Sequence, residues 1–535
     1  MQRCASWLCA TVLFTSPTFV PTSAAQAAPA DVSDLRIDPL LLVSAKEYRH
    51  ILETIGPDIY PGWTWNTIPL LLYRPKVQDI LLNAPHRPPG FVNFTGHTVL
   101  PDQTIYARND STTRDIDGQN TSITLDSMRV LVVADEYSRM REQIRGNLRQ
   151  HSDSLTQDWL EKWRFIQSPY DEVGTILHEA FHVQQDRLAP EKGANEAAVA
   201  HYPVLDATNN ALVALEARVL RDAVLAPTPG ERRAKAEQFL AVRSMRRAGL
   251  DTASASYEDL NEFKEGTAKY VQYRFMQIGD RVTPTPEMYL HTGFIGYGRG
   301  VLRRLLKDEM DDMAAVAAFS DNRFGNKFGG GPLRFRLYAT GGAQGLLLDE
   351  IAPDWKSKIF APGVYLTGLL AKALPLSDGR RATLAAQAKA AYGYDSILVN
   401  RQALEAEGRR AIQQRADEIL NTSRTLVTVS YAGAGDITGM RYTPFGMTAL
   451  NDHTTMYDLV PFAVRFTNKA VLNMKSVVPV IVDRQAKTIT FAISTVATAF
   501  DGKSASALDL PELTLTASAA TTVTVSGNKV SIELR

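Results

Sequence analysis

Two histidines and a glutamate that are close in the chain could perform metal-assisted hydrolysis. Residues 178–182 read His-Glu-Ala-Phe-His, which is the pattern H-E-x-x-H. Residues four apart share one face of a helix, so His178 and His182 could both bind one tetrahedral Zn²⁺. Such a metal acidifies a bound water, and Glu179 could accept a proton from that water. The pattern is typical of zinc-dependent hydrolases.

The flanking sequence predicts the helix that must hold these side chains. Asp171 and Glu172 are acidic residues suited to a first helical turn, and apolar residues then recur at helical spacing as far as Phe181. Pro190 ends the pattern. The alternative interpretation is a pair of ordinary histidines, which are usually exposed or hydrogen-bonded core groups. An amphipathic, core-packed helix favours the metal site.

A catalytic zinc needs a third protein ligand, and no histidine follows His182 at the metzincin spacing. A later segment reads Glu265-Gly266-Thr267-Ala268, in which small residues after the carboxylate allow a second helix to approach closely. This E-G-x-A arrangement resembles the gluzincins, the HExxH metallopeptidases whose third ligand is a glutamate on a later helix. The resemblance implies that Glu265 is the third zinc ligand. It also implies an α+β fold with a zincin-like catalytic domain, made of a small sheet and a helical bundle.

Two other glutamates remain open as the third ligand. Glu262 lies three residues before Glu265, roughly on the same helix face, and could bind the metal or support one of the histidines. Glu216 is the weaker alternative, because most helical glutamates are solvated or salt-bridged. Helices predicted at 209–225 and 231–248 would carry most of the chain between His182 and Glu265. Loop closure permits such a long insertion, because its free-energy cost rises only logarithmically with length.

A tetrahedral oxyanion usually needs one more hydrogen-bond donor. We predict Tyr338 for this role, because it follows Arg334 and Arg336 and begins a Gly-rich helical stretch, while His291 and Tyr270 remain alternatives. The stretch 338–349 is also similar to part of a group of secreted bacterial proteins of unassigned activity, which share the HEAFH and E-G-x-A-x-Y motifs. That resemblance covers about residues 60 to 375 and supports a fold more than a substrate.

Composition argues against nucleic-acid binding, because 58 basic residues balance 58 acidic ones in the 535-residue chain. Residues 1–27 have the features of a signal peptide: Arg3, an apolar core at 7–14 and the small-residue site Ala25-Gln26-Ala27. We therefore expect a secreted or periplasmic protein with no membrane span. The two cysteines, Cys4 and Cys9, both lie in that segment, so the exported chain is expected to have no disulfides.

Periodicity divides the remaining chain into four parts. We expect a mixed part with a sheet at 28–134, a helical catalytic core at 135–285 that begins with a helix at 135–165, a helical subdomain at 286–420, and a β-sandwich-like domain at 421–535. In the first part, residues 122–125 or 129–133 could form the edge strand that pairs with a substrate backbone. Residues 525–530 predict a tight hairpin. The Gly-rich loops 293–300 and 325–332 are expected at the rim of the active site, since neither has the sequence of a phosphate-binding loop.

Together these features predict a secreted zinc-dependent metallopeptidase that acts on a peptide or protein substrate. Three alternatives remain: an inactive zincin-like scaffold whose C-terminal β domain recognises a partner or glycan, a different hydrolase with the same ligands, and an accidental motif. Metal binding separates the last of these from the others.

Overall fold

The computed structural model describes residues 39–66, 69–74, 77–94, 100–109, 120–134, 168–316, 330–443, 446–500, 507–517 and 522–535. The expected signal peptide, the predicted helix at 135–165 and most of the Gly-rich loop at 325–332 lie outside these ranges.

The first described part confirms the predicted sheet. Helix α1 (Pro39–Ile59) precedes strands β1 (Leu70–Arg74), β2 (Gln78–Leu82), β3 (Val92–Phe94), β4 (Ile105–Asn109), β5 (Thr121–Leu125) and β6 (Met128–Ala134). Their order is β3-β4-β2-β1-β6-β5, with β1 and β6 parallel and the other neighbours antiparallel. β5 is therefore an edge strand among the described residues. The interpretation of 129–133 as an edge strand is wrong, because β6 pairs on both sides, with β1 and with β5.

The middle of the chain is helical. Its helices are α4 (Pro169–Leu188), α5 (Ala207–Leu225), α6 (Pro229–Arg247), α7 (Thr252–Asn261), α8 (Thr267–Ile278), α9 (Val301–Val316), α10 (Gly330–Ile351), α11 (Trp355–Lys358), α12 (Leu366–Ala373), α13 (Asp378–Ala391) and α14 (Tyr394–Leu420). Short turns include the 3-10 segments η2 (Glu196–Ala200), η4 (Gly279–Arg281) and η5 (Pro286–Leu290) and the π-helical segment η3 (Glu262–Gly266). The helices predicted at 209–225 and 231–248 are confirmed as α5 and α6. The sequence also explains where α6 begins, because Thr228 and Glu231 form a capping box.

The C-terminal part is built from two sheets. Strands β7 (Thr425–Ser430), β9 (Met447–Ala449), β10 (Thr454–Tyr457), β13 (Val480–Asp483), β14 (Thr488–Ile493), β17 (Thr522–Ser526) and β18 (Lys529–Glu533) form the first, in the order β17-β18-β7-β14-β13-β10-β9. Strands β8 (Ile437–Arg441), β11 (Ala463–Phe466), β12 (Val471–Met474), β15 (Ala507–Asp509) and β16 (Leu513–Thr516) form the second, in the order β15-β16-β12-β11-β8. The predicted hairpin is confirmed: Ser526 pairs with Lys529 around Gly527, whose φ is 61°.

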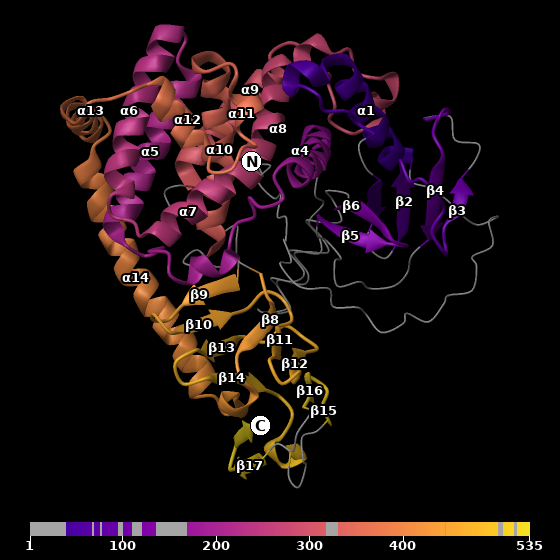
Figure 1. The fold of residues 1–535 in the computed structure, drawn as a ribbon, viewed down its shortest axis with the longest axis vertical. Helices are drawn as coiled ribbons and strands as arrows, with labels where there is room; N and C mark the ends of the chain where they lie inside the picture. Colours follow the sequence, from indigo (N-terminus) through magenta and orange to yellow (C-terminus); the bar gives the residue numbers. More distant parts are fainter. Residues whose placement is uncertain are drawn as a thin grey trace.

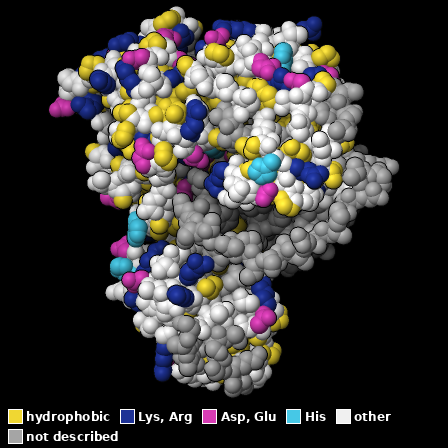
Figure 2. Space-filling view, turned by 45° about the vertical axis from the view of Figure 1, so that its right-hand side comes forward, with side chains coloured by type: hydrophobic (Ala, Val, Ile, Leu, Met, Phe, Trp, Pro, Cys, Tyr) yellow, Lys and Arg dark blue, Asp and Glu magenta, His cyan; other side chains and the backbone are white. Residues whose placement is uncertain are grey.

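The arrangement of these parts positions the candidate site. Figure 1 shows the β1–β6 sheet beside α1 and α4, the other helices on the opposite side, and the C-terminal strands below them, with α14 extending down along the strands. The apolar core of the two C-terminal sheets continues into the helical part, where it includes Val199, Tyr257, Leu333 and Leu337. On the visible face in Figure 2, basic and acidic side chains are interspersed over the helical part, as the balanced composition predicts. In the part of the chain that the structure describes, no helix is both long and apolar enough to cross a membrane.

Candidate metal centre

Helix α4 presents the H-E-x-x-H residues to the protein interior. Ser168 caps the helix by accepting a hydrogen bond from the Asp171 amide, and Pro169 occupies the first turn, where its missing N–H does no harm. Most of the helix is buried. His178 and Glu179 have no exposed surface and His182 is 4 % exposed. The local pattern therefore holds both imidazoles one turn apart on a fixed, core-packed helix.

The third ligand candidate, Glu265, lies in the π-helical segment η3 between α7 and α8. A π-helical turn inserts an extra residue into the helix and re-aims the side chains around it, and such turns are frequent at functional sites. Next to Glu265, Gly266 meets Gly341 of α10 so closely that a Cβ built on Gly266 would lie 2.5 Å from the Gly341 Cα. Glycine is therefore required at this crossing, and the crossing holds Glu265 against α4 and α10.

The structure brings His178, His182 and Glu265 together. Glu265 Oε2 lies 3.5 Å from His178 Nε2 and 3.4 Å from His182 Nε2, and the three ligand atoms all lie within 4.8 Å of one another. These separations are long for N–H···O hydrogen bonds, whose length is about 2.9 Å. The two distances from Glu265 Oε2 match the distance of about 3.4 Å between two ligand atoms of a tetrahedral ion with bonds of about 2.0–2.1 Å.

Burial strengthens this argument. The same three atoms are buried, and none has a hydrogen-bond partner among the described residues. A buried polar atom without a partner is destabilising, so three that face one another need an explanation. Two imidazole nitrogens and one carboxylate oxygen are a suitable donor set for a transition-metal ion. This group could therefore hold a metal ion.

Gln185 determines which nitrogen of His182 is available, and sequence reasoning missed it. Its Nε2 donates to the carbonyls of Phe263 and Lys264, at 3.0 and 2.7 Å, and to Thr267 Oγ1 at 2.6 Å. These acceptors fix the orientation of the amide, so Gln185 Oε1, 2.6 Å from His182 Nδ1, must accept the imidazole proton. His182 Nε2 then carries the lone pair that a metal needs. The signal was present in the sequence as a polar residue three positions after His182.

The carboxylate of Glu265 is held from behind by Arg334. Arg334 Nη2 donates to Glu265 Oε1 at 2.6 Å, and neither side chain is exposed. Burial by itself raises the pKa of Glu265, but Arg334, and after it His182, outweigh burial and hold that pKa well below its usual range. Burial lowers the pKa of His178, although Glu265 opposes this change. Both shifts favour the unprotonated groups that bind metal.

Glu179 lies on the other side of the candidate ligands and contacts the sheet. Asn120 Nδ2 donates to Glu179 Oε1 at 3.3 Å, while Asn120 Oδ1 accepts from the amide of Ala134 at 3.0 Å. Asn120 immediately precedes the edge strand β5, and Ala134 ends β6. The predicted base is therefore fixed relative to the edge of the sheet. Sequence reasoning also missed Asn120, because nothing local indicates a contact with a residue so far along the chain.

Of the three candidates for the oxyanion donor, the structure brings Tyr338 to the site. Its ring stacks on His178, with centroids 5.7 Å apart and planes 8° apart. Within the described residues its buried hydroxyl has no hydrogen-bond partner. Burial raises the pKa of Tyr338 well above its usual range, against the opposing effect of Arg334, so the hydroxyl remains a donor.

The other two candidates have different contacts. His291 Nε2 lies 3.3 Å from Ser44 Oγ on α1, and Tyr270 donates to Asp349 at 2.7 Å. Neither contact involves the candidate ligands. The structure therefore favours Tyr338 on position alone.

The rival glutamates are already engaged in ion pairs. Glu262 accepts from Arg243 and, at 2.7 Å, from Thr340. Glu216 accepts from Arg243 at 2.6 Å and from Arg246 at 2.7 Å. All of these groups are buried, and both carboxylates are occupied by partners other than the two imidazoles. Only Glu265 forms a potential metal-binding group with them among the described residues.

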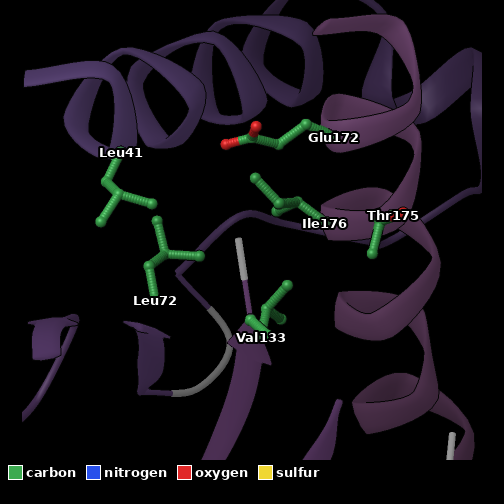
Figure 3. A pocket seen from close by; sticks show the side chains of 7 residues that line it. Leu41, Leu72, Val133, Glu172, Thr175 and Ile176 are labelled. Atoms are coloured by element: carbon green, nitrogen blue, oxygen red, sulfur yellow. The ribbon is translucent and has the colours of Figure 1, made fainter. Parts of the chain in front are cut away.

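A small pocket lies on the same side of α4 as Glu179. It is lined by Leu41, Leu72, Val133, Ala134, Glu172, Thr175 and Ile176, and Figure 3 shows these side chains around it. Ile176 and Glu172 precede Glu179 by three and seven residues, which places the three on one helix face. The Glu172 carboxylate accepts from Ser44 at 2.7 Å, so it joins α4 to α1 at the end of the pocket.

Comparison with known proteins adds no relative, because no family model, no curated protein and no solved structure matches the chain significantly.

Proposed function

We propose that the protein is a secreted zinc-dependent metallopeptidase of gluzincin type. The proposal rests on the group of three buried ligand atoms on His178, His182 and Glu265. Glu265 Oε2 lies 3.5 and 3.4 Å from the two imidazole nitrogens, and the three atoms have no other hydrogen-bond partners among the described residues. Zinc suits this set, because two histidines and a glutamate with one open position are a known catalytic zinc site. The helical part with its neighbouring sheet would then be zincin-like, and the two C-terminal sheets a sandwich-like domain.

Glu179, Asn120 and Tyr338 have different roles in the proposed reaction. A bound Zn²⁺ would supply a Lewis acid that polarises the peptide carbonyl and lowers the pKa of water. Glu179 accepts a proton from that water during attack and returns it to the leaving amine. Asn120 orients the Glu179 carboxylate for both transfers. Tyr338 donates a hydrogen bond to the oxygen on which negative charge develops.

The edge of β5 to which no strand of the described residues is hydrogen-bonded would align the substrate. Because Asn120 precedes this strand and contacts Glu179, an extended peptide that pairs with β5 would pass beside the base. Such strand pairing favours an extended peptide over a small soluble ester as the substrate.

The first prediction tests this function. Purified mature protein should contain one zinc ion per chain and cleave members of a peptide library, and a chelator such as 1,10-phenanthroline should stop the cleavage. The Glu179→Gln variant should retain the zinc and lose the cleavage, because a neutral amide cannot accept the proton of water. Zinc content by elemental analysis and peptide products by mass spectrometry measure the two effects.

Each outcome has a distinct meaning. Wild-type protein that holds zinc but cuts no peptide would be the inactive scaffold or a hydrolase for another bond. Protein without metal, and with no change of metal content in His178→Ala, would make the motif accidental.

A further inference from the structure

Arg334 occupies a buried position between two carboxylates. Its Nη2 donates to Glu265 Oε1 at 2.6 Å, and its Nη1 donates to Glu196 and, at 3.1 Å, to Asn261. Tyr257 donates to the other oxygen of Glu196 at 3.0 Å, so that partner is fixed as well. The planar guanidinium spans both carboxylates at once, which the single ammonium of a lysine cannot do in the same geometry.

This arrangement assigns different tasks to the two oxygens of Glu265. Oε1 is bound to Arg334, whereas Oε2 faces the Nε2 atoms of His178 and His182 at 3.5 and 3.4 Å. Bringing both oxygens to one metal ion would break a charge-assisted hydrogen bond inside the protein. A metal in this site would therefore contact Glu265 through one oxygen, and its fourth position would stay open for water.

The charges fit the same arrangement. Glu196, Arg334 and Glu265 together carry one net negative charge when all are ionised, and the imidazoles are neutral as ligands. A divalent ion would leave the centre with one net positive charge, which is suitable for polarising a carbonyl. Without Arg334, the carboxylates of Glu196 and Glu265 would be buried with no shared cation between them.

From these contacts we infer that Arg334 is a positioning residue, which makes Glu265 a one-oxygen ligand and keeps the fourth metal position open. The inference rests on the metal site of the proposed function, but it does not depend on which bond is cleaved. Arg334 itself touches neither substrate nor metal in this role, and it acts only through Glu265.

Helix α10 contains a matched control. Arg336 is 3 % exposed, like Arg334 a buried arginine of the same helix, and pairs with Glu258 at 3.1 Å and with Tyr202. None of these partners is a candidate metal ligand. Changing Arg336 should therefore destabilise the protein in a comparable way and leave metal coordination unchanged.

The experiment uses the full mature chain with Arg334→Lys, Arg334→Gln, Arg336→Lys and Arg336→Gln. Zinc affinity is measured by competition with a chromophoric chelator, below the melting temperature of every variant. We expect Arg334→Lys to weaken zinc binding about 10–100-fold, as is typical for residues that orient a ligand, and Arg334→Gln to weaken it more. The Arg336 variants should bind zinc as the wild type does.

Cobalt provides a readout that a loss of stability alone would not change. Wild-type protein loaded with Co²⁺ should show the intense visible absorption of a four-coordinate ion. In the Arg334 variants both oxygens of Glu265 can reach the ion, so the absorption should weaken toward that of a five-coordinate site. The wild-type spectrum tests the one-oxygen ligand even if the variants fail to fold, because weak absorption in the wild type overturns it.

The remaining outcomes separate this inference from the proposed function. Equal zinc affinity and equal cobalt spectra in Arg334→Lys and wild type overturn the role of Arg334 alone. Weaker binding in that variant, together with no peptide cleavage by the wild type, supports the role of Arg334 while the peptidase proposal fails. Wild-type protein that binds neither Zn²⁺ nor Co²⁺ overturns both.

Discussion

Individual side chains at the candidate centre depend on their neighbours for the form in which they could bind metal. Glu265 is held ionised by Arg334, and His182 is held as the tautomer with a free Nε2 by Gln185. Glu262, only three residues from Glu265, is instead held by Arg243 and Thr340. The two glutamates are thus alike in type and burial, and they differ only in their partners.

This difference leads to a prediction for two matched variants. Glu265→Gln should reduce zinc affinity by more than the roughly 10–100-fold that is typical of a neighbouring residue, because an amide is a poor metal ligand. Glu262→Gln should leave zinc affinity unchanged but lower the free energy of unfolding by about 1–3 kcal/mol, because it removes one of the two carboxylates that pair with buried Arg243. Chelator competition and urea unfolding measure the two quantities. A larger loss of zinc affinity in Glu262→Gln would make Glu262 the ligand.

At the scale of elements, the site depends on two segments that cross without side chains between them. A Cβ on Gly341 of α10 would lie 2.6 Å from Gly266 Cα and 2.8 Å from the carbonyl oxygen of Glu262. The crossing therefore connects the segment that carries Glu265 directly to the helix that carries Arg334 and Tyr338. A change in this contact would move ligand and supporting residue relative to each other.

Gly341→Ala should therefore lower the free energy of unfolding by about 1–3 kcal/mol, as overpacking commonly does, and should also weaken zinc binding. Gly368→Ala on α12 is the control, because a Cβ there meets nothing within 4 Å. That variant should be unchanged or more stable by up to about 1 kcal/mol, since alanine favours a helix more than glycine. Thermal unfolding and zinc competition test both. If the two variants behave alike, the close crossing does not position the site.

The contact between α14 and the residue after β10 should make stability depend on pH. Burial raises the pKa of Asp458 to about 6, and Arg415 of α14, 3.9 Å away, opposes this only in part. A carboxyl with a raised pKa binds its proton more tightly in the folded state. It therefore contributes stability below the unfolded pKa, near 4, and this contribution is lost as the pH rises through about 6.

Between pH 4 and pH 7 the free energy of unfolding should fall by about 3 kcal/mol from this group. Asp458→Asn should lack this pH dependence, so it should gain stability over the wild type as the pH rises from 4 to 7. Urea unfolding at a series of pH values, for wild type and variant, gives the comparison. Parallel curves would show that Asp458 titrates normally in the folded protein.

Across the molecule as a whole, the C-terminal sheets and the candidate metal centre share supporting structure. Leu333 and Leu337 of α10 belong to the core of the C-terminal sheets, whereas Arg334 and Tyr338 on the same helix contact Glu265 and His178. One helix therefore serves both parts.

This connection predicts different effects for two leucines of one core. Leu337→Ala and Leu515→Ala each remove a buried side chain and should each lower the free energy of unfolding by about 2–5 kcal/mol. Only Leu337→Ala should also weaken zinc binding, because Leu515 lies on β16 and has no element in common with the site. The measurement is zinc affinity at a temperature where both variants are folded. Equal affinities would mean that the C-terminal sheets do not support the centre.

Features that follow from local spacing could be predicted from the order of the amino acids. The positions of His178 and His182 one helical turn apart, the helices α5 and α6 to within two residues at each end, and the hairpin around Gly527 all depend on residues within a few positions of one another. Local hydrogen bonding and periodicity act at that range, so these features could be read in advance.

Features that depend on distant partners became visible only in the folded chain. In an α-helix Glu262 and Glu265 would lie roughly on the same face, but both belong to the π-helical segment η3 and have different partners: Arg243 for Glu262, and Arg334 with the two histidines for Glu265. Likewise, among the described strands, β6 lies inside the sheet and β5 at its edge because β1 pairs with β6, a choice that depends on packing across the chain. A buried charge takes the partner that folding brings within hydrogen-bond distance, and the spacing of residues along the chain contains no record of that partner.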